Sequence, residues 1–443
     1  DLSNLKENTL LLEKIKNKEA RIGIIGLGYV GLPLALTFGK AGFRTTGLDI
    51  DAIKIDSLNK GQSYIKHIPS EEIQPLIKEN LLEVSTDFSL ISDLNCILLC
   101  VPTPLTKHRE PDMSFIVNTA KKISPYLSKD TLIILESTTY PGTTQEILAP
   151  ELESANNLKQ GRDYFLAYSP EREDPNNPIY KTADIPKVIG ADSKEAKDAA
   201  LALYGAIIKE LVPVSSTKTA EATKLMENIF RSVNIALVNE LKVIFKKMDI
   251  DIWEVIEAAK TKPFGYMPFY PGPGLGGHCI PIDPFYLTWK AREYGISTRF
   301  IELAGEINIS MPSYVVEKIL FALNRTDKKM GDCRVLLLGL AYKKNVDDER
   351  ESVTYKIINL LTEQGIHVDY NDPFIPRIKQ KREYKVLAGK KSVPLSCIDS
   401  YDLTAILTDH SVYDYESIVK KSKIVIDTRN ACKNIQSDKV IKA

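Results

Sequence analysis

Apolar positions in the first half of the chain occur in short runs that are separated by stretches with helical periodicity. From Arg21 to about residue 210 the runs are RIGIIG, FRTTGLDI, NCILLCVPTP, TLIILES, YFLAYSP, PKVIG and KELVPV. Runs of this length that alternate with helices are typical of buried parallel strands, which are apolar on both faces. The pattern predicts a doubly wound α/β domain.

The middle of the chain is helical. Between Leu225 and Phe245 a long helix has apolar side chains on nearly every face, so we expect it to be buried on most sides. Ser215–Thr217 supply N-cap chemistry for this helix. More helices follow, interrupted by a Gly/Pro-rich loop from Thr261 to Asp283. Because one domain pair cannot cover such a helix, we predict a homodimer built around it.

The α/β pattern returns at Cys333 with CRVLLLGLAYK, SVTYKIINLLTEQG, HVDYNDP, TAILTD and KIVIDTRN. The segment VLLLGLAYKKNV is similar to IGIIGLGYVGLP but lacks its second and third glycines. We therefore predict a second Rossmann-type unit without a dinucleotide loop. The expected domains are 1–213, with a short helix over 1–20, then 214–325 and 326–443.

Charge and cysteine content narrow the function. The 58 basic side chains balance the 58 acidic ones, so no net charge attracts nucleic acid or a membrane surface. No apolar run reaches membrane-spanning length, and the charged opening DLSNLKENTLLLEKIKNKEA is unlike a signal peptide, which favours the cytoplasm. The six cysteines form no CxxC and no His-Cys cluster, which argues against a metal site and against disulfides.

The stretch GLGYVG follows a predicted strand and opens a predicted helix. Gly26, Gly28 and Gly31 turn the chain and admit a pyrophosphate to the helix N-terminus, with Tyr29 and Val30 between them. Asp49, 18 residues beyond Gly31, ends the next predicted strand. Its carboxylate can accept hydrogen bonds from the hydroxyl groups of a ribose. Its charge would repel a 2′-phosphate, so NAD is favoured over NADP. Lys54 either touches the cofactor or is an ordinary surface lysine.

Later strand ends carry further polar residues. Thr103, Ser137 and Thr138 lie where open α/β sheets bind ligands, and they either line a nicotinamide pocket or serve as turn and cap residues. Glu171 and Arg172 follow the strand YFLAY, and a carboxylate there is either a general base or a helix cap.

Two features of the middle region point to chemistry. Lys224, Asn228 and Arg231 form one polar stripe on the long helix, and a buried lysine without a purpose is costly. In PGPGLGGHCIPIDP, Cys279 follows a glycine-rich backbone and precedes Asp283 by four residues. A thiol beside an NAD site can trap an aldehyde as a thiohemiacetal, which gives up a hydride to form a thioester that water cleaves. Because side chains of neighbouring residues point apart, we interpret the adjacent His278 as a bystander.

Four segments resemble, in order and spacing, the nucleotide-sugar 6-dehydrogenases: GLGYVGLPLA, KLMENIFRSVNIALVNEL, PGPGLGGHCIPIDP and GLAYKKNVDDERES. This family includes the UDP-glucose, UDP-N-acetylglucosamine and UDP-N-acetylmannosamine dehydrogenases, and the resemblance covers essentially the whole chain after residue 20. The segments KPFGYMPFYPGPGLGGHCIPIDP and KGQSYIKHI are most similar to the UDP-N-acetylglucosamine 6-dehydrogenases of bacterial capsule or O-antigen pathways.

The resemblance implies a role for each matching residue. By motif position Cys279 resembles the nucleophile, Lys224 and Asn228 the oxyanion-stabilising pair, and Asp283 the carboxylate that orders lysine and water. Glu171 resembles the acid/base glutamate, and Thr138 the threonine beside the catalytic water. The cofactor would also meet Arg350, and the residues implied for the UDP-sugar are Arg172, Arg231, Tyr270, Gly272, Gly274, Gly276, Tyr342, Lys343 and Arg429.

The expected activity is NAD-dependent oxidation of C6 of a UDP-N-acetylhexosamine, with UDP-N-acetylglucosamine as the first choice. UDP-glucose dehydrogenases have a second glutamate four residues after the first, and here Pro175 stands in its place. UDP-N-acetylmannosamine, UDP-N-acetylgalactosamine and UDP-glucose stay as alternatives. A catalytically silent NAD-binding scaffold is the non-enzyme alternative, although it would not need Cys279, Lys224, Asn228 and Asp283 together.

Overall fold

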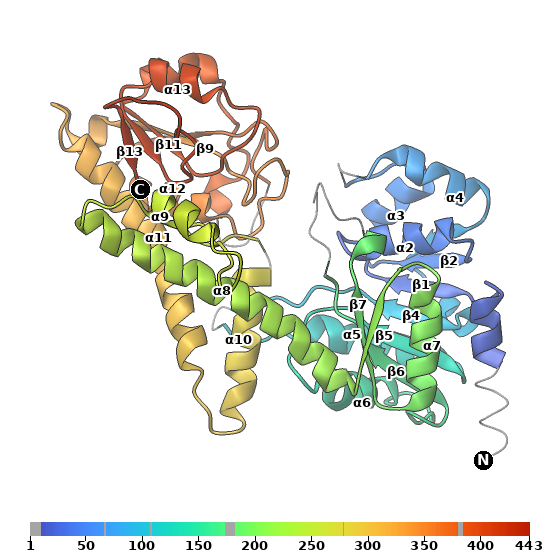
Figure 1. The fold of residues 1–443 in the computed structure, drawn as a ribbon. Helices are drawn as coiled ribbons and strands as arrows, with labels where there is room; N and C mark the ends of the chain where they lie inside the picture. The colour runs from blue at the N-terminus through green and yellow to red at the C-terminus, as the bar shows by residue number, and fades with distance from the viewer. Residues whose placement is uncertain (1–9, 66–67, 107–108, 173–181, 278, 380–383) are drawn as a thin grey trace. The chain divides into compact units, whose positions relative to one another are not determined.

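The computed structural model describes residues 10–65, 68–106, 109–172, 182–277, 279–379 and 384–443, without the side chains of Thr182 and Cys279 (Figure 1). The chain divides into two compact units. Unit 1 consists of Asp1–Glu227 and Phe285–Ile296, and unit 2 consists of Asn228–Pro284 and Ser297–Ala443. The finer division into domains 1–213, 214–325 and 326–443 stays a prediction.

Unit 1 is built on an eight-stranded sheet with the order β3-β2-β1-β4-β5-β6-β7-β8. The strands are β1 Ile22–Ile25, β2 Thr45–Leu48, β3 Leu82–Ser85, β4 Cys96–Leu99, β5 Thr131–Leu135, β6 Tyr164–Tyr168, β7 Lys187–Ala191 and β8 Leu211–Val214. The first six are parallel, in the order typical of dinucleotide-binding folds. β7 pairs antiparallel with β6, so the prediction of parallel strands was wrong for β7 and β8. An apolar run does not encode the direction of a strand.

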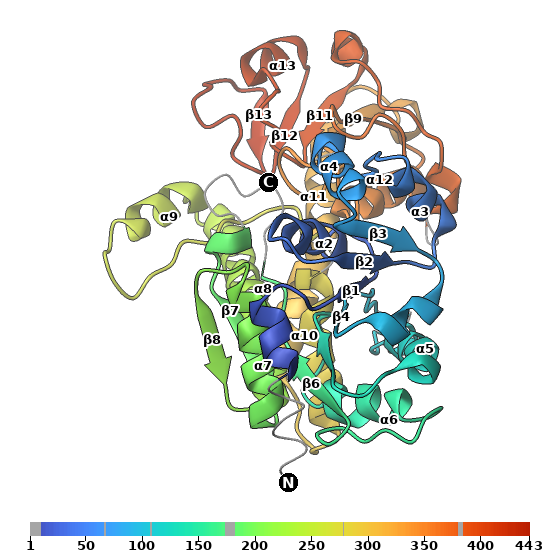
Figure 2. The same ribbon diagram turned by 90° about the vertical axis from the view of Figure 1, so that its right-hand side faces the viewer.

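Helices cover both faces of this sheet (Figures 1 and 2). Residues 10–16 are helical, and the named helices are α2 Gly31–Lys40, α3 Ala52–Asn59, α4 Gln74–Lys78, α5 Ser114–Ile123, α6 Ala149–Leu152 and α7 Lys194–Gly205. α2 and α7 share one apolar core with the strands through side chains such as Phe38 and Leu203. α5 and α6 join a second core through Ile116 and Leu152. The sheet is therefore doubly wound, as predicted.

Unit 2 contains a parallel five-stranded sheet with the order β10-β9-β11-β12-β13. Its strands are β9 Arg334–Leu338, β10 His367–Asn371, β11 Leu403–Ile406, β12 Val425–Asp427 and β13 Val440–Lys442. α11 Arg299–Leu323 and α12 Val353–Glu363 pack on one face, and α13 Tyr415–Lys421 packs on the other. This confirms the second α/β region that the sequence predicts.

The central helix is α8 Thr217–Lys247, followed by α9 Ile252–Lys260 and α10 Cys279–Arg292. The Ser216 hydroxyl accepts a hydrogen bond from the Thr219 amide at 3.1 Å, which is the predicted N-cap. Large apolar side chains on α8 are exposed by 43–66%, namely Met226, Phe230, Leu237 and Ile244. One copy buries Leu225, Val238 and the stripe that includes Asn228, Ser232, Ala236 and Asn239, so α8 is buried on only part of its surface in a single copy. That a second copy covers the rest stays a prediction.

Among the residues described, no helix combines the length and the apolar character that crossing a bilayer requires.

Candidate active site

The glycine loop between β1 and α2 has the geometry of a phosphate cradle. A Cβ added at Gly31 would lie 1.9 Å from the Gly26 carbonyl oxygen, so only glycine permits this close turn. A Cβ added at Gly28 would meet nothing within 4 Å. The loop therefore leaves open space beside the N-terminus of α2, where a pyrophosphate would be stabilised. Tyr29 and Val30 lie half-buried in the same loop.

Asp49 lies directly beside this loop at the end of β2. Its carboxylate is 6% exposed and accepts hydrogen bonds from the Leu27 amide at 2.8 Å and the Asp51 amide at 3.0 Å. Lys54 places its ammonium 3.3 Å from Asp49 Oδ2. The structure thus brings the predicted ribose-binding acid and the glycine loop together, with Lys54 next to them.

The predicted nicotinamide residues share the carboxyl edge of the sheet. Ser137, at the end of β5, donates to the Val101 carbonyl beyond β4 at 2.7 Å. Thr103 is 3% exposed, and its carbonyl accepts a hydrogen bond of 2.6 Å from Tyr286 of α10. Thr138 is half-buried beside Ser137. β4 and β5 follow β1 in the sheet order, so these residues and the glycine loop lie at the end of neighbouring strands.

Glu171 lies beside a buried charge cluster that the sequence reasoning did not predict. Glu136 directly follows β5 and pairs with Lys187 of β7, with Nζ and Oε2 2.9 Å apart. Lys187 also lies 3.7 Å from Glu171 Oε2. Burial favours the neutral amine, but the Glu136 and Glu171 carboxylates outweigh it, so the pKa of Lys187 is raised. Lys187 therefore carries a fixed positive charge beside the predicted acid/base residue.

Within unit 1, α8 holds the segment that carries Glu171. Lys224 is 7% exposed and donates from Nζ to the Glu171 carbonyl oxygen at 2.5 Å. Arg172 forms an ion pair of 2.8 Å with Glu227. The predicted Lys224, Glu171 and Arg172 are thus neighbours.

Glu221, one turn before Lys224, is a second residue that sequence reasoning missed. Its fully buried carboxylate accepts hydrogen bonds from the Gly142 amide and from the Thr144 amide and hydroxyl, at 2.6–2.9 Å. Burial raises the pKa of Glu221 to about 7. Glu221 therefore connects the loop after Ser137 and Thr138 to α8. The sequence signal that could have identified Glu221 is its position three residues before Lys224.

In unit 2, three predicted residues form a hydrogen-bonded chain. The Asn228 side-chain amide donates to Asp283 Oδ2, and Arg231 donates to Asn228 Oδ1. Asn228 and Asp283 are fully buried. α10 begins at Cys279, one helical turn before Asp283. The side chain of Cys279 lies outside the described residues, as do Pro175 and His278.

The predicted sugar loop is held by α8. Asn239 accepts from the Gly272 amide at 3.0 Å, and Lys242 donates to the Gly272 carbonyl at 3.2 Å. Lys242, which the sequence reasoning did not single out, is 5% exposed, and burial together with Arg429 lowers its pKa to about 7. A Cβ at Gly272 would lie 2.7 Å from Arg429 Nη1, so this predicted pair is in contact.

Other predicted substrate residues lie in this loop or next to it, as does Arg350, which the resemblance assigns to the cofactor. A Cβ at Gly276 would lie 2.7 Å from Tyr342 Cβ, and the Gly277 amide donates to the Arg350 carbonyl at 3.0 Å. Tyr270 donates its hydroxyl to Glu257 at 2.7 Å. Gly274 packs near Pro312 and Val353 of α11 and α12, and Lys343 follows Tyr342 after β9. Arg350 also pairs with Asp348 at 2.6 Å.

Comparison with known proteins agrees with this arrangement. Models of the UDP-glucose/GDP-mannose dehydrogenase family match the chain over residues 20–208 (NAD binding domain), 218–310 (central domain) and 336–434 (UDP binding domain). The chain belongs to this family. It is an NAD-dependent UDP-sugar dehydrogenase, which confirms the predicted cofactor and class of enzyme.

Relatives cover almost the whole chain. The UDP-N-acetyl-D-glucosamine 6-dehydrogenase of Pseudomonas aeruginosa is 38% identical over 89% of this chain and 92% of its own length. The UDP-N-acetyl-D-mannosamine dehydrogenase of Pyrococcus horikoshii is 34% identical over 93% of this chain and 96% of its own. A solved structure of the UDP-ManNAc dehydrogenase from Pyrococcus horikoshii superposes with a TM-score of 0.85, at 31% identity, over 95% of this chain and 98% of that one.

Proposed function

We propose that the chain oxidises C6 of a UDP-N-acetylhexosamine, with UDP-N-acetylglucosamine as substrate, to the uronic acid. The observation that carries this proposal is the hydrogen-bonded pair Asn228 and Asp283, fully buried and one turn beyond Cys279. A buried amide and carboxylate beside a candidate thiol suit a reaction that creates negative oxygen and needs a held water. The relative from Pseudomonas aeruginosa supports the choice of sugar.

The open backbone at Gly28 and the carboxylate of Asp49 fit NAD, which when bound accepts a hydride in each half of the reaction. In the first half the C6 alcohol loses a hydride and a proton and becomes an aldehyde. Glu171, held near Lys187, would move the proton. Arg429 and the Gly272 loop would orient the sugar.

In the second half the Cys279 thiolate adds to the aldehyde carbon and forms a thiohemiacetal. Loss of a second hydride gives a thioester, and water cleaves the carbon–sulfur bond to release the carboxylate and the thiol. Lys224 and Asn228 would stabilise the oxyanion formed at each addition, and Asp283 and Thr138 would hold the water. Each residue thus acts where charge develops.

Cys279→Ser tests this route. The serine hydroxyl is protonated at neutral pH, whereas cysteine supplies some thiolate, so uronic acid formation should fall by about a thousandfold or more. Mass spectrometry after incubation with substrate and NAD should detect either aldehyde or a slowly hydrolysed sugar ester on the protein. Cys397→Ser, at a half-buried thiol of the same unit, is the matched control and should keep the normal rate. Unaltered uronic acid formation by Cys279→Ser would contradict the covalent route.

UDP-N-acetylmannosamine is the second candidate substrate, because the relative and the solved structure from Pyrococcus horikoshii carry that sugar in their names. We place either reaction in the cytoplasm, within capsule or O-antigen synthesis. A Staphylococcus aureus relative named Protein CapL, 34% identical over 92% of this chain, supports the link to capsule synthesis.

We also propose a homodimer through α8. Leu237 and Ile244 are 51% and 44% exposed, and an apolar stripe of this kind is stabilised by a second copy of the same helix. Leu237→Arg should shift the protein toward monomer in light scattering at micromolar concentration. Val386→Arg, at a valine that is 97% exposed, is the control and should leave the mass unchanged. A monomeric unaltered protein would overturn this proposal.

A further inference from the structure

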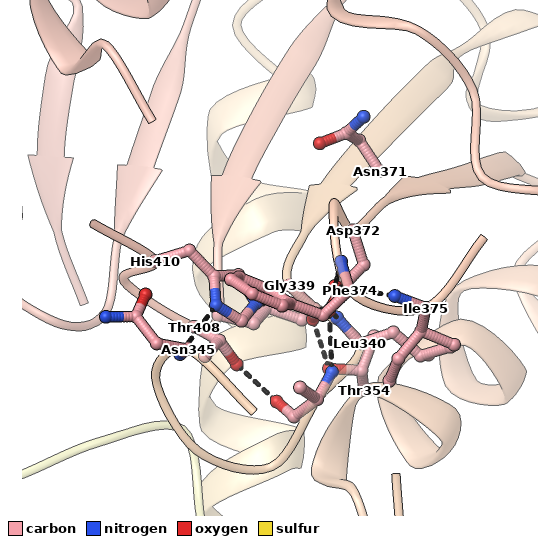
Figure 3. A network of polar contacts seen from close by, with 12 residues as sticks. Gly339, Leu340, Asn345, Thr354, Asn371, Asp372, Phe374, Ile375, Thr408 and His410 are labelled. Carbon is pink, nitrogen blue, oxygen red and sulfur yellow. Dashed lines mark hydrogen bonds and ion pairs between the residues drawn. The ribbon is translucent and has the colours of Figure 1, made fainter. Parts of the chain in front are cut away.

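Asp372, at the end of β10, is the centre of a buried polar cluster in unit 2 (Figure 3). Its Oδ2 accepts hydrogen bonds from the Leu340 and Ala341 amides at 2.7 and 2.8 Å. These amides belong to the β9 loop, which we define as residues 339–346. His410 Nε2 lies 3.2 Å from the same oxygen. The cluster thus joins the β9 loop to the β11 loop, which we define as residues 407–411.

The contacts of His410 identify its tautomer. The Asn345 amide donates to His410 Nδ1 at 2.9 Å. A backbone N–H can only donate, so Nδ1 has no proton in this arrangement. Nε2 therefore carries the single proton and donates it to Asp372. The ring is fully buried and is neutral when both bonds are made.

The β11 loop fixes the β9 loop at two places. Thr408 donates from its hydroxyl to the Ala341 carbonyl at 2.6 Å. At the other end Asn345 has a positive φ of 60°, and its side chain exchanges two hydrogen bonds of 2.9 Å with Ser411. Tyr342 and Lys343, which the family resemblance assigns to the UDP-sugar, lie between these attachment points. Their placement therefore depends on the residues that hold Ala341 and Asn345.

We propose that His410 is a positioning residue for the UDP moiety, and that the hydrogen bonds of its two ring nitrogens hold the β9 loop in the shape that binds the nucleotide. This inference rests on the proposed function. Without an acceptor at Nδ1 the Asn345 amide would lose its hydrogen bond. Loss of this bond would release the loop and weaken nucleotide-sugar binding without touching the reacting atoms.

The groups around His410 favour this role. From β10, Asp372 accepts the Nε2 proton, and the Phe374 ring lies 4.9 Å from the imidazole. From the β9 loop, Lys344 lies 3.4 Å from Asp409, so these two charges largely offset each other. The phenols of Tyr413 and Tyr415 complete the surroundings, with the Tyr415 hydroxyl 2.9 Å from the His410 carbonyl.

Two amide substitutions separate the bonds of His410. In His410→Asn the side-chain oxygen can take the place of Nδ1 and accept a hydrogen bond from the Asn345 amide. In His410→Gln the longer amide reaches toward Asp372 instead and leaves the Asn345 amide without its acceptor. His367→Asn, at an exposed histidine that begins β10, is the matched control.

The first measurement is hydrogen–deuterium exchange of a peptide that covers the β9 loop, without ligand. At about pH 8, His410→Asn should be protected like the unaltered protein, and His410→Gln should exchange about fivefold to tenfold faster. The control His367→Asn should also exchange at the rate of the unaltered protein. Equal exchange in the two His410 variants would overturn the proposal.

The second measurement is calorimetric binding of UDP-N-acetylglucosamine, whose pyrophosphate diester does not titrate near neutral pH. His410→Gln should raise the Kd about fivefold to tenfold at about pH 8, with the kcat at saturating substrate unchanged. His410→Asn and His367→Asn should keep the Kd of the unaltered protein. Changes in exchange without matching changes in Kd would also overturn the proposal. An unaltered protein that does not bind this nucleotide sugar, with the exchange pattern intact, would instead overturn the proposed substrate.

Discussion

Asp49 and Asp372 occupy the same position in the sheets of unit 1 and unit 2. Each ends the strand beside the first strand of its sheet, and each accepts a hydrogen bond from the loop that follows the first strand. The Asp49 carboxylate accepts hydrogen bonds from the Leu27 and Asp51 amides and forms an ion pair with the partly exposed Lys54.

Asp372 accepts four backbone amides and His410. The Asp49 carboxylate has the surroundings of a ligand site, whereas the Asp372 carboxylate makes its hydrogen bonds to groups of the protein itself.

The loops beside the two acids differ in the same way. The loop in unit 1 leaves open space at Gly28, whereas Gly339 in unit 2 faces Thr408, whose Cβ would lie 2.4 Å from an added Cβ. Thr354 also donates to the Gly339 carbonyl at 2.9 Å. Thus the same topology supports a dinucleotide site only where side chains leave the loop open and the acid available.

The largest contrast is expected in stability. Asp372→Asn replaces a buried acceptor with a group that presents two N–H donors to backbone amides, so the free energy of unfolding should fall by about 3 kcal/mol or more. Asp49→Asn should change it by less than about 1 kcal/mol, because Asp49 has fewer amide partners. Denaturant unfolding of both variants measures the difference. Equal losses would mean that the two acids have the same structural role.

A second contrast concerns the glycines. Gly339→Ala adds a methyl group at a φ of 95° and against Thr408, so it should destabilise the fold by roughly 2 kcal/mol. Gly28→Ala should leave the melting temperature almost unchanged but weaken NAD binding about tenfold, because the methyl group fills the space of the pyrophosphate. Calorimetric titration with NAD and a thermal melt of each variant separate the two effects. A Gly28→Ala protein that binds NAD normally would contradict the cradle.

The smallest effect is a change in cofactor choice. The unaltered protein should prefer NAD to NADP, since the Asp49 carboxylate repels a 2′-phosphate. Asp49→Ala should narrow that preference about tenfold by weakening NAD binding. Rates of NADH and NADPH formation at matched cofactor concentrations measure the ratio. Equal turnover with both cofactors in the unaltered protein would contradict the ribose assignment.

The fold could be predicted where local patterns decide it. Seven strands of unit 1 were predicted from apolar runs, whereas β3 was missed because Glu83 is an exposed residue within a short strand. The wrong direction of β7 and β8 has a similar cause, because pairing with β6 depends on distant residues.

The site shows the same limit. The glycine loop and Asp49 were predictable because strand, turn and acid lie close together in the sequence. Glu221 meets Gly142 across 79 residues, and His410 meets Asn345 across 65. Neither contact leaves a local pattern. In the sequence Lys242 looks like an ordinary helical lysine. Its special environment becomes evident only in the structure, from its proximity to Gly272 and Arg429.

The central claim is that the chain oxidises an alcohol to a carboxylate in two steps on a UDP-N-acetylhexosamine. The most direct test is to count NADH formed per UDP-sugar consumed, over a panel of UDP-N-acetylglucosamine, UDP-N-acetylmannosamine, UDP-N-acetylgalactosamine and UDP-glucose. Our account predicts about two NADH per molecule of UDP-N-acetylglucosamine, with the uronic acid as product. One NADH per sugar, or none with any member of the panel, would contradict it.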